Sequence, residues 1–306
     1  MNILVVGAGA TGGYFGGRLV QAGRDVTFLV RERRAAALRE RGLRIVGPVG
    51  AEVIEPRLVI AGNLTGVADV VLVTVKAAGL NAVIDEIGPA VGPGTTIVPV
   101  LNGMRHMDML NSAFGSSRVL GGVALMTTQL DDNGDVQQLN DLVSLRIGAQ
   151  DGQRTQPVEQ ALRLLSDAGF PVGVSDRIVA EMWSKWAFIS AAAAVTCLLR
   201  GTVGEIVSVE GGDQVVRAIV EETSAIARGA GYPIADTEAR QTLTTLTAPG
   251  SPFAPSMYRD LRQGRPVETE TILGDLIAEG HKADLHTPLL DAATVALRIY
   301  GNDRRQ

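Results

Sequence analysis

The chain has 306 residues, a length that corresponds to about two domains of ~150 residues each. Hydrophobic residues make up 46% and charged residues 20%, the proportions of an ordinary globular protein, which excludes extensive disorder. The acidic, unclustered charge balance, with a formal net charge of −5, argues against nucleic-acid binding and against a basic membrane anchor.

Cys197 is the only cysteine, so the chain can form neither an intramolecular disulfide nor a cysteine-cluster metal site. This fits a reducing cytosol, and we expect a cytoplasmic protein. The three histidines lack metal-ligand spacing, and no metal is expected. The N-terminal apolar run is broken by glycines, so we expect no signal peptide. The apolar run 186–199 has 14 residues where a bilayer span needs about 20, which predicts a buried helix and no membrane association.

Strand-like and helix-like segments alternate over the first half of the chain. Apolar strands are predicted at residues 2–6, 26–30, 70–75 and 95–100, and helices at 11–22 and 33–41. Residues 70–75 are nearly all apolar, which is typical of a strand buried on both faces. The alternation predicts an α/β fold with a doubly wound parallel sheet.

Two segments interrupt this alternation. Residues 43–60 combine Gly-Pro and Val-Gly turn signals with short β-branched pieces and predict a hairpin. Residues 131–147 predict a second hairpin, which turns at Asp132-Asn133-Gly134.

Beyond about residue 175 the strand signals stop, and only helices are predicted. They are expected at 176–199, 213–231, 236–246, 266–282 and 288–300, each beginning with an Asp cap or a Pro in its first turn. The chain therefore divides into an α/β domain, residues 1–174, and an all-α domain, residues 175–306. The Ala-rich run within 186–199 fits either an internal core or a dimer interface, so a homodimer is compatible with the sequence.

The segment Gly7-Ala8-Gly9-Ala10-Thr11-Gly12 fits the pattern GxGxxG, directly after a strand and at the start of a helix. Gly7 permits a tight turn, Gly9 lets the backbone approach a pyrophosphate, and Gly12 lets the helix pack on the strand. The phosphates would meet the N–H groups at the helix N-terminus. We therefore predict dinucleotide binding by residues 7–12, and the alternative is a glycine-rich turn used only for packing. Close helix packing is expected of three further glycines, Gly13, Gly16 and Gly17.

The residues after the second strand bear on the choice between NAD and NADP. The position that carries an acid in NAD-binding folds is Val30, and Arg31-Glu32-Arg33-Arg34 follows it. Arginine matches a 2′-phosphate bidentately, which favours NADP(H). Glu32 is the counter-argument, because a small shift in register would make it an NAD acid. The alternative is that these charged residues only form a solvated helix start, and we expect this alternative to hold for Arg33 or Arg34.

Lys76 and Asn102 each follow a predicted buried strand. Because the carboxyl ends of parallel strands face the ligand crevice, both residues are placed to touch a cofactor or substrate. The alternatives are a surface lysine that caps a strand and an ordinary Asn-Gly turn.

Lys185 enters the long apolar helix between Trp183 and Trp186. Burial lowers the pKa of a lysine, and a lysine tuned in this way can donate a proton to a developing alkoxide at neutral pH. The alternative is a lysine whose ammonium reaches solvent from the helix start. Pro266 is expected in a first helical turn, so Glu268 would lie where the helix dipole stabilises a carboxylate, and an ordinary helix-start glutamate is the alternative.

Taken together, these motifs resemble the ketopantoate reductases (2-dehydropantoate 2-reductases) over essentially the whole chain. The matching elements are GxGAxG at 7–12, Arg31, Lys76, Asn102-Gly103, W-x-K at 183–185, and Ser256, Met257, Asp260 and Glu268. The resemblance implies a Rossmann-type domain and a helical domain with the active site in the cleft between them. It also implies NADPH-dependent reduction of ketopantoate to pantoate, a 2-keto acid reaction that feeds pantothenate and coenzyme A synthesis.

The resemblance further implies a role for each matching residue. Lys185 would be the proton donor to the keto oxygen, and Glu268 would orient that lysine or the substrate hydroxyl. Ser256 would hold the substrate carboxylate. Asn102 would lie near the nicotinamide and the substrate, and Lys76 would line the cleft.

The chain departs from the family pattern at two positions. Many members carry asparagines four and eight residues after the catalytic lysine, where this chain has Ile189 and Ala193. Since an apolar side chain cannot replace an amide's hydrogen bonds, another 2-keto acid is the first alternative substrate. A non-catalytic NADPH-binding sensor is the second alternative, although a pure binder would not need Lys185 and Glu268. An oxidative hydroxyacid dehydrogenase would fit better with NAD and an acid at position 30.

Overall fold

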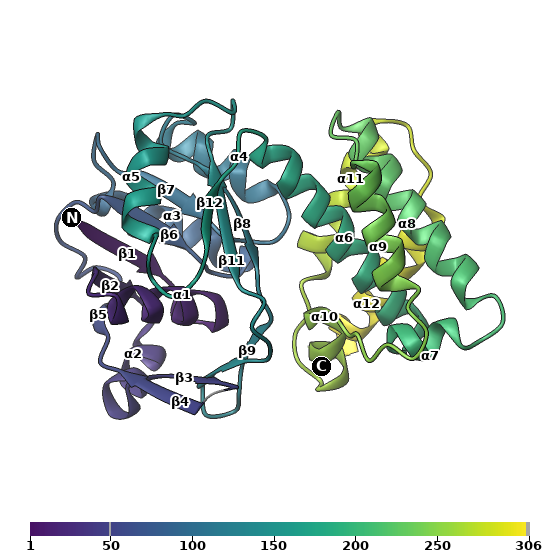
Figure 1. Ribbon diagram of the computed structural model, residues 1–306, viewed down its shortest axis with the longest axis horizontal. Coiled ribbons are helices and arrows are strands. Elements are labelled where there is room, and N and C mark those ends of the chain that lie inside the picture. The colour runs from purple at the N-terminus through teal and green to yellow at the C-terminus, as the bar shows by residue number, and fades with distance from the viewer. Residues whose placement is uncertain (49, 304–306) are drawn as a thin grey trace. The chain divides into compact units, whose positions relative to one another are not determined.

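A computed structural model describes residues 1–48 and 50–303 and divides them into two compact units (Figure 1). The first unit comprises Met1–Leu101 and His106–Val179, and the second comprises Asn102–Arg105 and the chain from Ala180 onward. All strands in the part of the chain that the structure describes belong to the first unit. An α/β fold followed by helices is therefore confirmed. The inclusion of Asn102–Arg105 in the helical unit has no signal in the sequence.

A five-stranded parallel sheet with the order β5-β2-β1-β6-β7 forms the centre of the first unit. Its strands are β1 (Asn2–Val6), β2 (Asp25–Leu29), β5 (Arg57–Val59), β6 (Val70–Val73) and β7 (Thr96–Pro99). Strands β6 and β7 are buried along their whole length, as expected of a parallel sheet covered on both faces. The four predicted strands are confirmed, and β5 adds a fifth.

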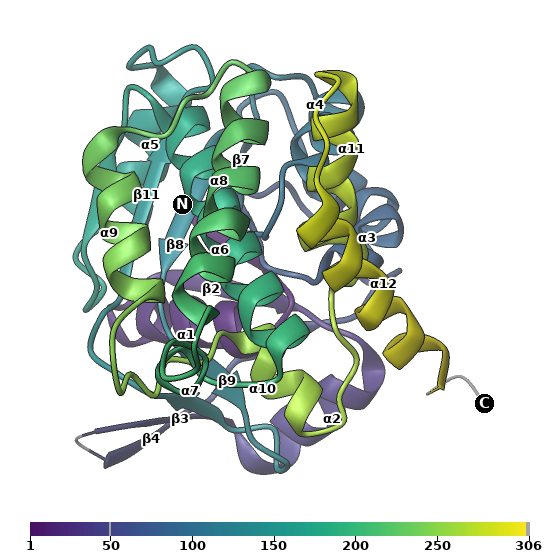
Figure 2. The ribbon, with the colours of Figure 1, turned by 90° about the vertical axis from the view of Figure 1, so that its right-hand side faces the viewer.

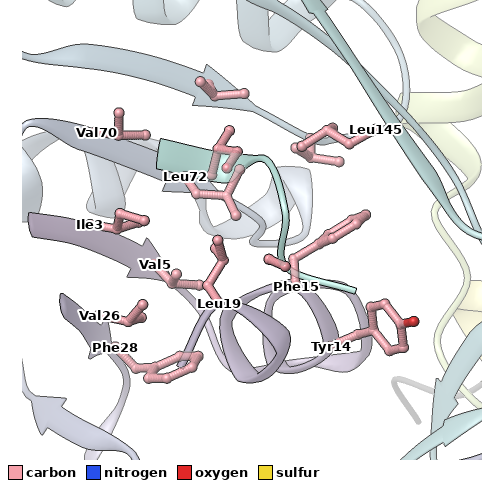
Figure 3. Packing of buried hydrophobic residues seen from close by; sticks show 14 of the residues in the cluster. Ile3, Val5, Tyr14, Phe15, Leu19, Val26, Phe28, Val70, Leu72 and Leu145 are labelled. Carbon is pink, nitrogen blue, oxygen red and sulfur yellow. The ribbon is translucent and has the colours of Figure 1, made fainter. Parts of the chain in front are cut away.

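The first half of the chain also forms helices. They are α1 (Ala10–Gln21), α2 (Glu32–Arg41), α3 (Leu80–Ile87), α4 (Arg105–Phe114) and α5 (Gln156–Leu165), with short turns η1 (Ala77–Gly79) and η2 (Gly88–Ala90). Figure 3 shows Phe15 and Leu19 of α1 facing the sheet residues Val5 and Leu72, and all four side chains are fully buried. The core thus fixes α1 directly behind β1.

Two smaller sheets complete the first unit. One has the order β4-β3-β10-β9, from β3 (Leu43–Gly47), β4 (Gly50–Ile54), β9 (Thr128–Leu130) and β10 (Val136–Gln138). The other joins β8 (Gly121–Leu125), β11 (Ser144–Gly148) and β12 (Val172–Val174). The hairpin predicted at 43–60 is confirmed for β3 and β4, whereas residues 57–59 form β5 of the parallel sheet instead. The one at 131–147 is wrong in its second arm: β10 ends at Gln138, and β11 pairs with β8 because Leu145 and Ile147 enter the core.

Close packing by the later glycines of α1 is confirmed. A Cβ on Gly16 would overlap the Phe28 ring, and a Cβ on Gly17 would lie 2.8 Å from Ile45. A Cβ on Gly13 would lie 2.9 Å from Val136. These glycines let α1 approach β2, β3 and β10 closely.

The second half of the chain is helical. Its elements are α6 (Ile178–Leu199), α7 (Val203–Val207), α8 (Gly212–Gly229), α9 (Asp236–Leu246), α10 (Ser256–Arg262), η3 (Glu270–Gly274), α11 (Asp275–Lys282) and α12 (Pro288–Asp303). Helix α8 contacts α9, α11 and α12 (Figure 2). The helices α7 and α10 were not predicted.

Two details of the helix starts differ from expectation. Asp213 and Asp236 lie inside the first turns of α8 and α9, whose N-cap residues are Gly211 and Ala235. The placement of Pro266 in a helical turn is also wrong, since residues 265–268 are non-helical and the helix starts at Thr269, directly before the π-helical turn η3. Glu268 therefore precedes the helix instead of lying within it.

Helix α6 has 22 residues and is long and apolar enough, by length and composition alone, to cross a membrane. However, 67% of its most apolar stretch is buried inside the structure, including Ala191, Ala192 and Ala194. Such burial is that of a core helix, as the sequence predicts.

Candidate active site

The glycine-rich segment joins β1 to α1, and each glycine has a distinct geometry. Gly7 has a φ of +95°, and its N–H donates to the carbonyl of Leu29 at 2.9 Å. No atom lies within 4 Å of the place where a Cβ of Gly9 would sit. A Cβ on Gly12 would overlap the carbonyl oxygen of Gly7 and the hydroxyl of Thr74. The turn, the open approach and the close packing of a dinucleotide-binding loop are therefore all present.

The N-terminus of α1 is available to an anion. Gly9 is its N-cap residue, and no side chain caps the helix. The first N–H groups of a helix lack intrahelical partners and carry the positive end of the dipole. With the open space above Gly9, this arrangement fits the pyrophosphate of a dinucleotide.

Arg31 and Lys76 flank the end of β1 from the two neighbouring strands. Arg31 is the N-cap residue of α2, and Lys76 is the N-cap residue of η1. A guanidinium nitrogen of Arg31 lies 3.4 Å from the place of a Cβ on Gly79, at the end of η1. Arg31 is exposed and makes no hydrogen bond or ion pair within residues 1–48 and 50–303. Its guanidinium can therefore accept an anionic ligand here.

The Glu32 side chain makes an interaction other than ribose binding. Its carboxylate forms an ion pair with Arg39 at 3.2 Å on the exposed face of α2. Val30 is buried and offers no polar group. Of the two positions where an acid would favour NAD, position 30 therefore holds an apolar residue, and the carboxylate at position 32 is already paired with Arg39.

The two remaining arginines of this segment differ from each other. Arg33 is exposed, as a solvated helix start would be. Arg34 is half-buried, and its Nε donates to the carbonyl oxygen of Ala8 in the glycine-rich loop at 2.9 Å. Sequence reasoning did not distinguish these neighbours, because nothing in the residue pattern shows which arginine turns inward.

Lys185 lies in the first half of α6, between Trp183 and Trp186 in the sequence. The Trp183 ring stacks on Tyr232 at 5.5 Å between ring centroids and packs against Trp186 at 5.1 Å. Burial lowers the pKa of Lys185 to about 8, the direction that the sequence predicts. Within the described part of the chain, Lys185 has no hydrogen-bond or ion-pair partner. Its ammonium can therefore release a proton close to neutral pH.

The segment that carries Glu268 is fastened to α6 at one backbone carbonyl. Trp186 Nε1 donates to the carbonyl oxygen of Ile272 at 3.0 Å, and Ser190 Oγ donates to the same oxygen at 2.8 Å. The N–H of Ile272 in turn donates to the carbonyl of Glu268 at 3.0 Å. Ile272 belongs to the π-helical turn η3, a rare geometry that recurs at functional sites.

The Asn102–Gly103 turn rests on the same π-helical turn. Gly103 has a φ of +78°, and a Cβ on it would lie 2.9 Å from the carbonyl oxygen of Thr271. Arg105 forms an ion pair with Asp275 at 3.8 Å. The structure therefore gathers the segments that carry Lys185, Glu268 and Asn102 around residues 271–272.

Ser256 belongs to a different element, as the exposed first residue of α10. Asp260, near the end of that helix, accepts a hydrogen bond from the N–H of Arg265 at 2.7 Å through its carbonyl. Its carboxylate lies 3.7 Å from the Arg265 guanidinium. Asp260 thus shapes the turn that leads from α10 to Glu268.

The predicted site residues fall into two groups. The first unit holds residues 7–12, Arg31 and Lys76, and the second unit holds Asn102, Lys185, Ser256 and Glu268. Sequence reasoning missed the contribution of Ser190, whose signal is a small hydroxyl four residues after Trp186 on one face of an otherwise apolar helix.

The chain is similar to proteins of one family over nearly its whole length. A profile described as "Ketopantoate reductase PanE/ApbA" matches residues 3–152, and its C-terminal counterpart matches residues 177–301. The uncharacterized oxidoreductase YkpB of Bacillus subtilis is 34% identical over 300 residues, which cover 98% of this chain and 99% of that protein.

Solved structures share the fold over nearly the full length. A 2-dehydropantoate 2-reductase from Geobacter metallireducens has 28% identity and a TM-score of 0.86, covering 97% of this chain and 99% of that one. A D-mandelate dehydrogenase, solved with NADH and anilino(oxo)acetate, has 21% identity and a TM-score of 0.89 and covers 100% of both chains. By the profile matches and the full-length relative, the chain is an oxidoreductase that belongs to the ketopantoate reductase family.

Proposed function

We propose that this chain is an NADPH-dependent reductase that converts ketopantoate, a 2-keto acid, to pantoate. The observation that carries the proposal is Lys185, whose burial lowers its pKa to about 8 on a helix that is hydrogen-bonded through Trp186 to Ile272, four residues after Glu268. A proton donor of this kind is what reduction of a keto group requires. A place in pantothenate and coenzyme A synthesis follows if ketopantoate is the substrate.

The residues of the first unit would hold the cofactor. The pyrophosphate would lie over Gly9 at the N-terminus of α1, and Arg31 would bind the 2′-phosphate. When bound, the nicotinamide supplies the hydride. NADPH is favoured over NADH because Val30 stands at the acid position and Glu32 is engaged with Arg39.

The residues of the second unit would handle the substrate. Protonated Lys185 offers a positive charge to the keto oxygen as negative charge develops there, and then donates its proton from Nζ to that oxygen. Glu268 would orient Lys185 or the product hydroxyl. Ser256 would hold the substrate carboxylate, and Asn102 would lie near the nicotinamide and the substrate.

A second substrate class is favoured by two positions on α6. Ile189 and Ala193 stand where many family members carry asparagine, and Ala193 is 1% exposed. Neither can donate a hydrogen bond to a substrate hydroxyl. A 2-keto acid with an apolar side chain is therefore the alternative to ketopantoate.

The test is loss of NADPH absorbance with the purified full chain, ketopantoate, and a panel of aliphatic and aromatic 2-keto acids, with NADH as the cofactor control. Fast oxidation with ketopantoate supports the proposal directly. Oxidation only with apolar 2-keto acids moves the assignment to the second class. Tight NADPH binding without oxidation by any keto acid would change the assignment from an enzyme to a nucleotide-binding sensor.

A further inference from the structure

We propose that Arg34 is a positioning residue that sets the orientation of the pyrophosphate-binding loop from behind. The inference rests on the proposed dinucleotide binding but goes beyond it. Arg34 would contact no part of the cofactor and would act through the backbone of Ala8. It would thus serve both nicotinamide dinucleotides alike, in contrast to Arg31.

One peptide group links Arg34 to the pyrophosphate-binding loop. Arg34 Nε donates to the carbonyl oxygen of Ala8 at 2.9 Å. The same planar peptide carries the N–H of Gly9, and in a trans peptide the C=O and N–H point in opposite directions. Holding the Ala8 oxygen therefore aims the Gly9 N–H away from Arg34. Gly9 is the residue with open space above it, where the pyrophosphate is expected.

The turn between β9 and β10 packs against the Arg34 guanidinium. Gly134, in the turn between β9 and β10, has a φ of +83°, and a Cβ on it would lie 2.5 Å from Arg34 Nη1. The N–H of Gly134 donates to the carbonyl of Asp131 at 3.0 Å and closes this turn. The Arg34 guanidinium is thus enclosed between the β9–β10 turn and the glycine-rich loop.

The inward placement of Arg34 is energetically unfavourable in itself. The Nη2 atom of Arg34 is buried and has no hydrogen-bond partner in the described residues, and burial lowers the pKa of the side chain. A buried donor left without a partner is unfavourable and rare in folded proteins. The exposed neighbour Arg33 carries no such cost. The hydrogen bond to the Ala8 carbonyl gives this unfavourable placement a role in the glycine-rich loop.

The experiment compares Arg34→Met with Arg34→Gln. Glutamine places an N–H donor at the position of Arg Nε, whereas methionine has the same length and no donor. Dissociation constants of NADPH and NADH are measured by fluorescence titration of the full chain, with circular dichroism and thermal melting as fold controls. Arg33→Met is the matched control, one residue away and exposed.

We expect Arg34→Met to weaken NADPH and NADH by the same factor, about tenfold, the loss expected for one hydrogen bond from a charged donor. Arg34→Gln should recover most of this affinity, and Arg33→Met should change neither constant. If Arg34→Met unfolds the protein, Gly134→Ala serves instead, since it displaces the guanidinium without removing it, and it should weaken both cofactors equally.

Three results would overturn the proposal. Unchanged affinities in a folded Arg34→Met protein would remove any role for the residue in binding. Selective weakening of NADPH would make Arg34 a reader of the 2′-phosphate. Equal losses in the Gln and Met variants would show that the Nε hydrogen bond is not responsible. If the wild-type chain binds neither nucleotide, the proposed function itself fails, and this outcome is distinct from the other three.

Discussion

Replacing Lys185 by methionine should separate what this side chain costs the fold from what it gives to catalysis. Burial lowers its pKa from 10.5 to about 8, so the folded protein disfavours the protonated form. Below pH 8 the penalty is full, and it disappears as pH rises past the unfolded-state value. At 1.36 kcal/mol for each pKa unit, it amounts to at most about 3 kcal/mol, because the side chain keeps some contact with solvent.

The variant should therefore be more stable at pH 7 than the wild type, by several degrees in Tm, at about 2–4 °C for each kcal/mol. The difference should shrink between pH 8 and 10.5, as the wild-type lysine loses its proton in the folded state. Turnover should fall by about 10²- to 10⁴-fold, the usual contribution of a positioned acid. In the wild type, kcat should decline as pH rises through about 8, because the donor becomes deprotonated.

The measurements are thermal melting from pH 7 to 10.5, steady-state kinetics over the same range, and NADPH titration to show that cofactor binding is retained. Lys282→Met is a suitable control, since Lys282 is an exposed lysine paired with Glu279 at the end of α11, and its loss should neither stabilise the protein nor slow turnover. A Lys185→Met protein with turnover within about tenfold of wild type would refute the proton-donor assignment. A lower Tm at pH 7 would refute the burial argument.

Two further substitutions test the other parts of the site. Arg31→Ala should weaken NADPH by about tenfold or more and leave NADH nearly unchanged in parallel titrations, since it removes a charged phosphate contact; equal weakening would contradict its role. Ser190→Ala removes one of two donors to the Ile272 carbonyl and should lower the free energy of unfolding by about 1 kcal/mol. It should also lower kcat several-fold with little change in NADPH affinity. The control is Thr196→Val, which removes a buried local hydrogen bond to Ala192 on the same helix and should lose similar stability but keep kcat. Equal losses of kcat in the Ser190 and Thr196 variants would show that Ser190 only stabilises the fold.

The parallel sheet could be predicted because its signals are local. Strands such as 70–73 are continuous apolar runs, and the glycine pattern at 7–12 carries its turn, its open position and its packing contact in the residue types themselves. The prediction for the second arm of the 131–147 hairpin was wrong, because β11 pairs with β8 and not with β10. This choice of partner is decided by burial of Leu145 and Ile147, which is a tertiary effect.

The parts of the candidate site that depend on backbone geometry were harder to predict from the sequence. A π-helical turn has no established residue signature, so η3 and the late helix start after Glu268 were not anticipated. The link from Trp186 and Ser190 to the Ile272 carbonyl joins residues more than 80 positions apart. The inward orientation of Arg34 was not predicted for a related reason, because an arginine in the first turn of a helix is ordinarily exposed to solvent.

The most direct test of the proposed reaction is transfer of deuterium. The full chain is incubated with NADPH deuterated at both C4 positions and with the 2-keto acid that it consumes fastest, and the product is analysed by mass spectrometry and NMR. Direct hydride reduction predicts a 2-hydroxy acid that carries a single deuterium, bound to C2. NADPH bound by the protein with no deuterated product from ketopantoate or from any other 2-keto acid would contradict a reductase.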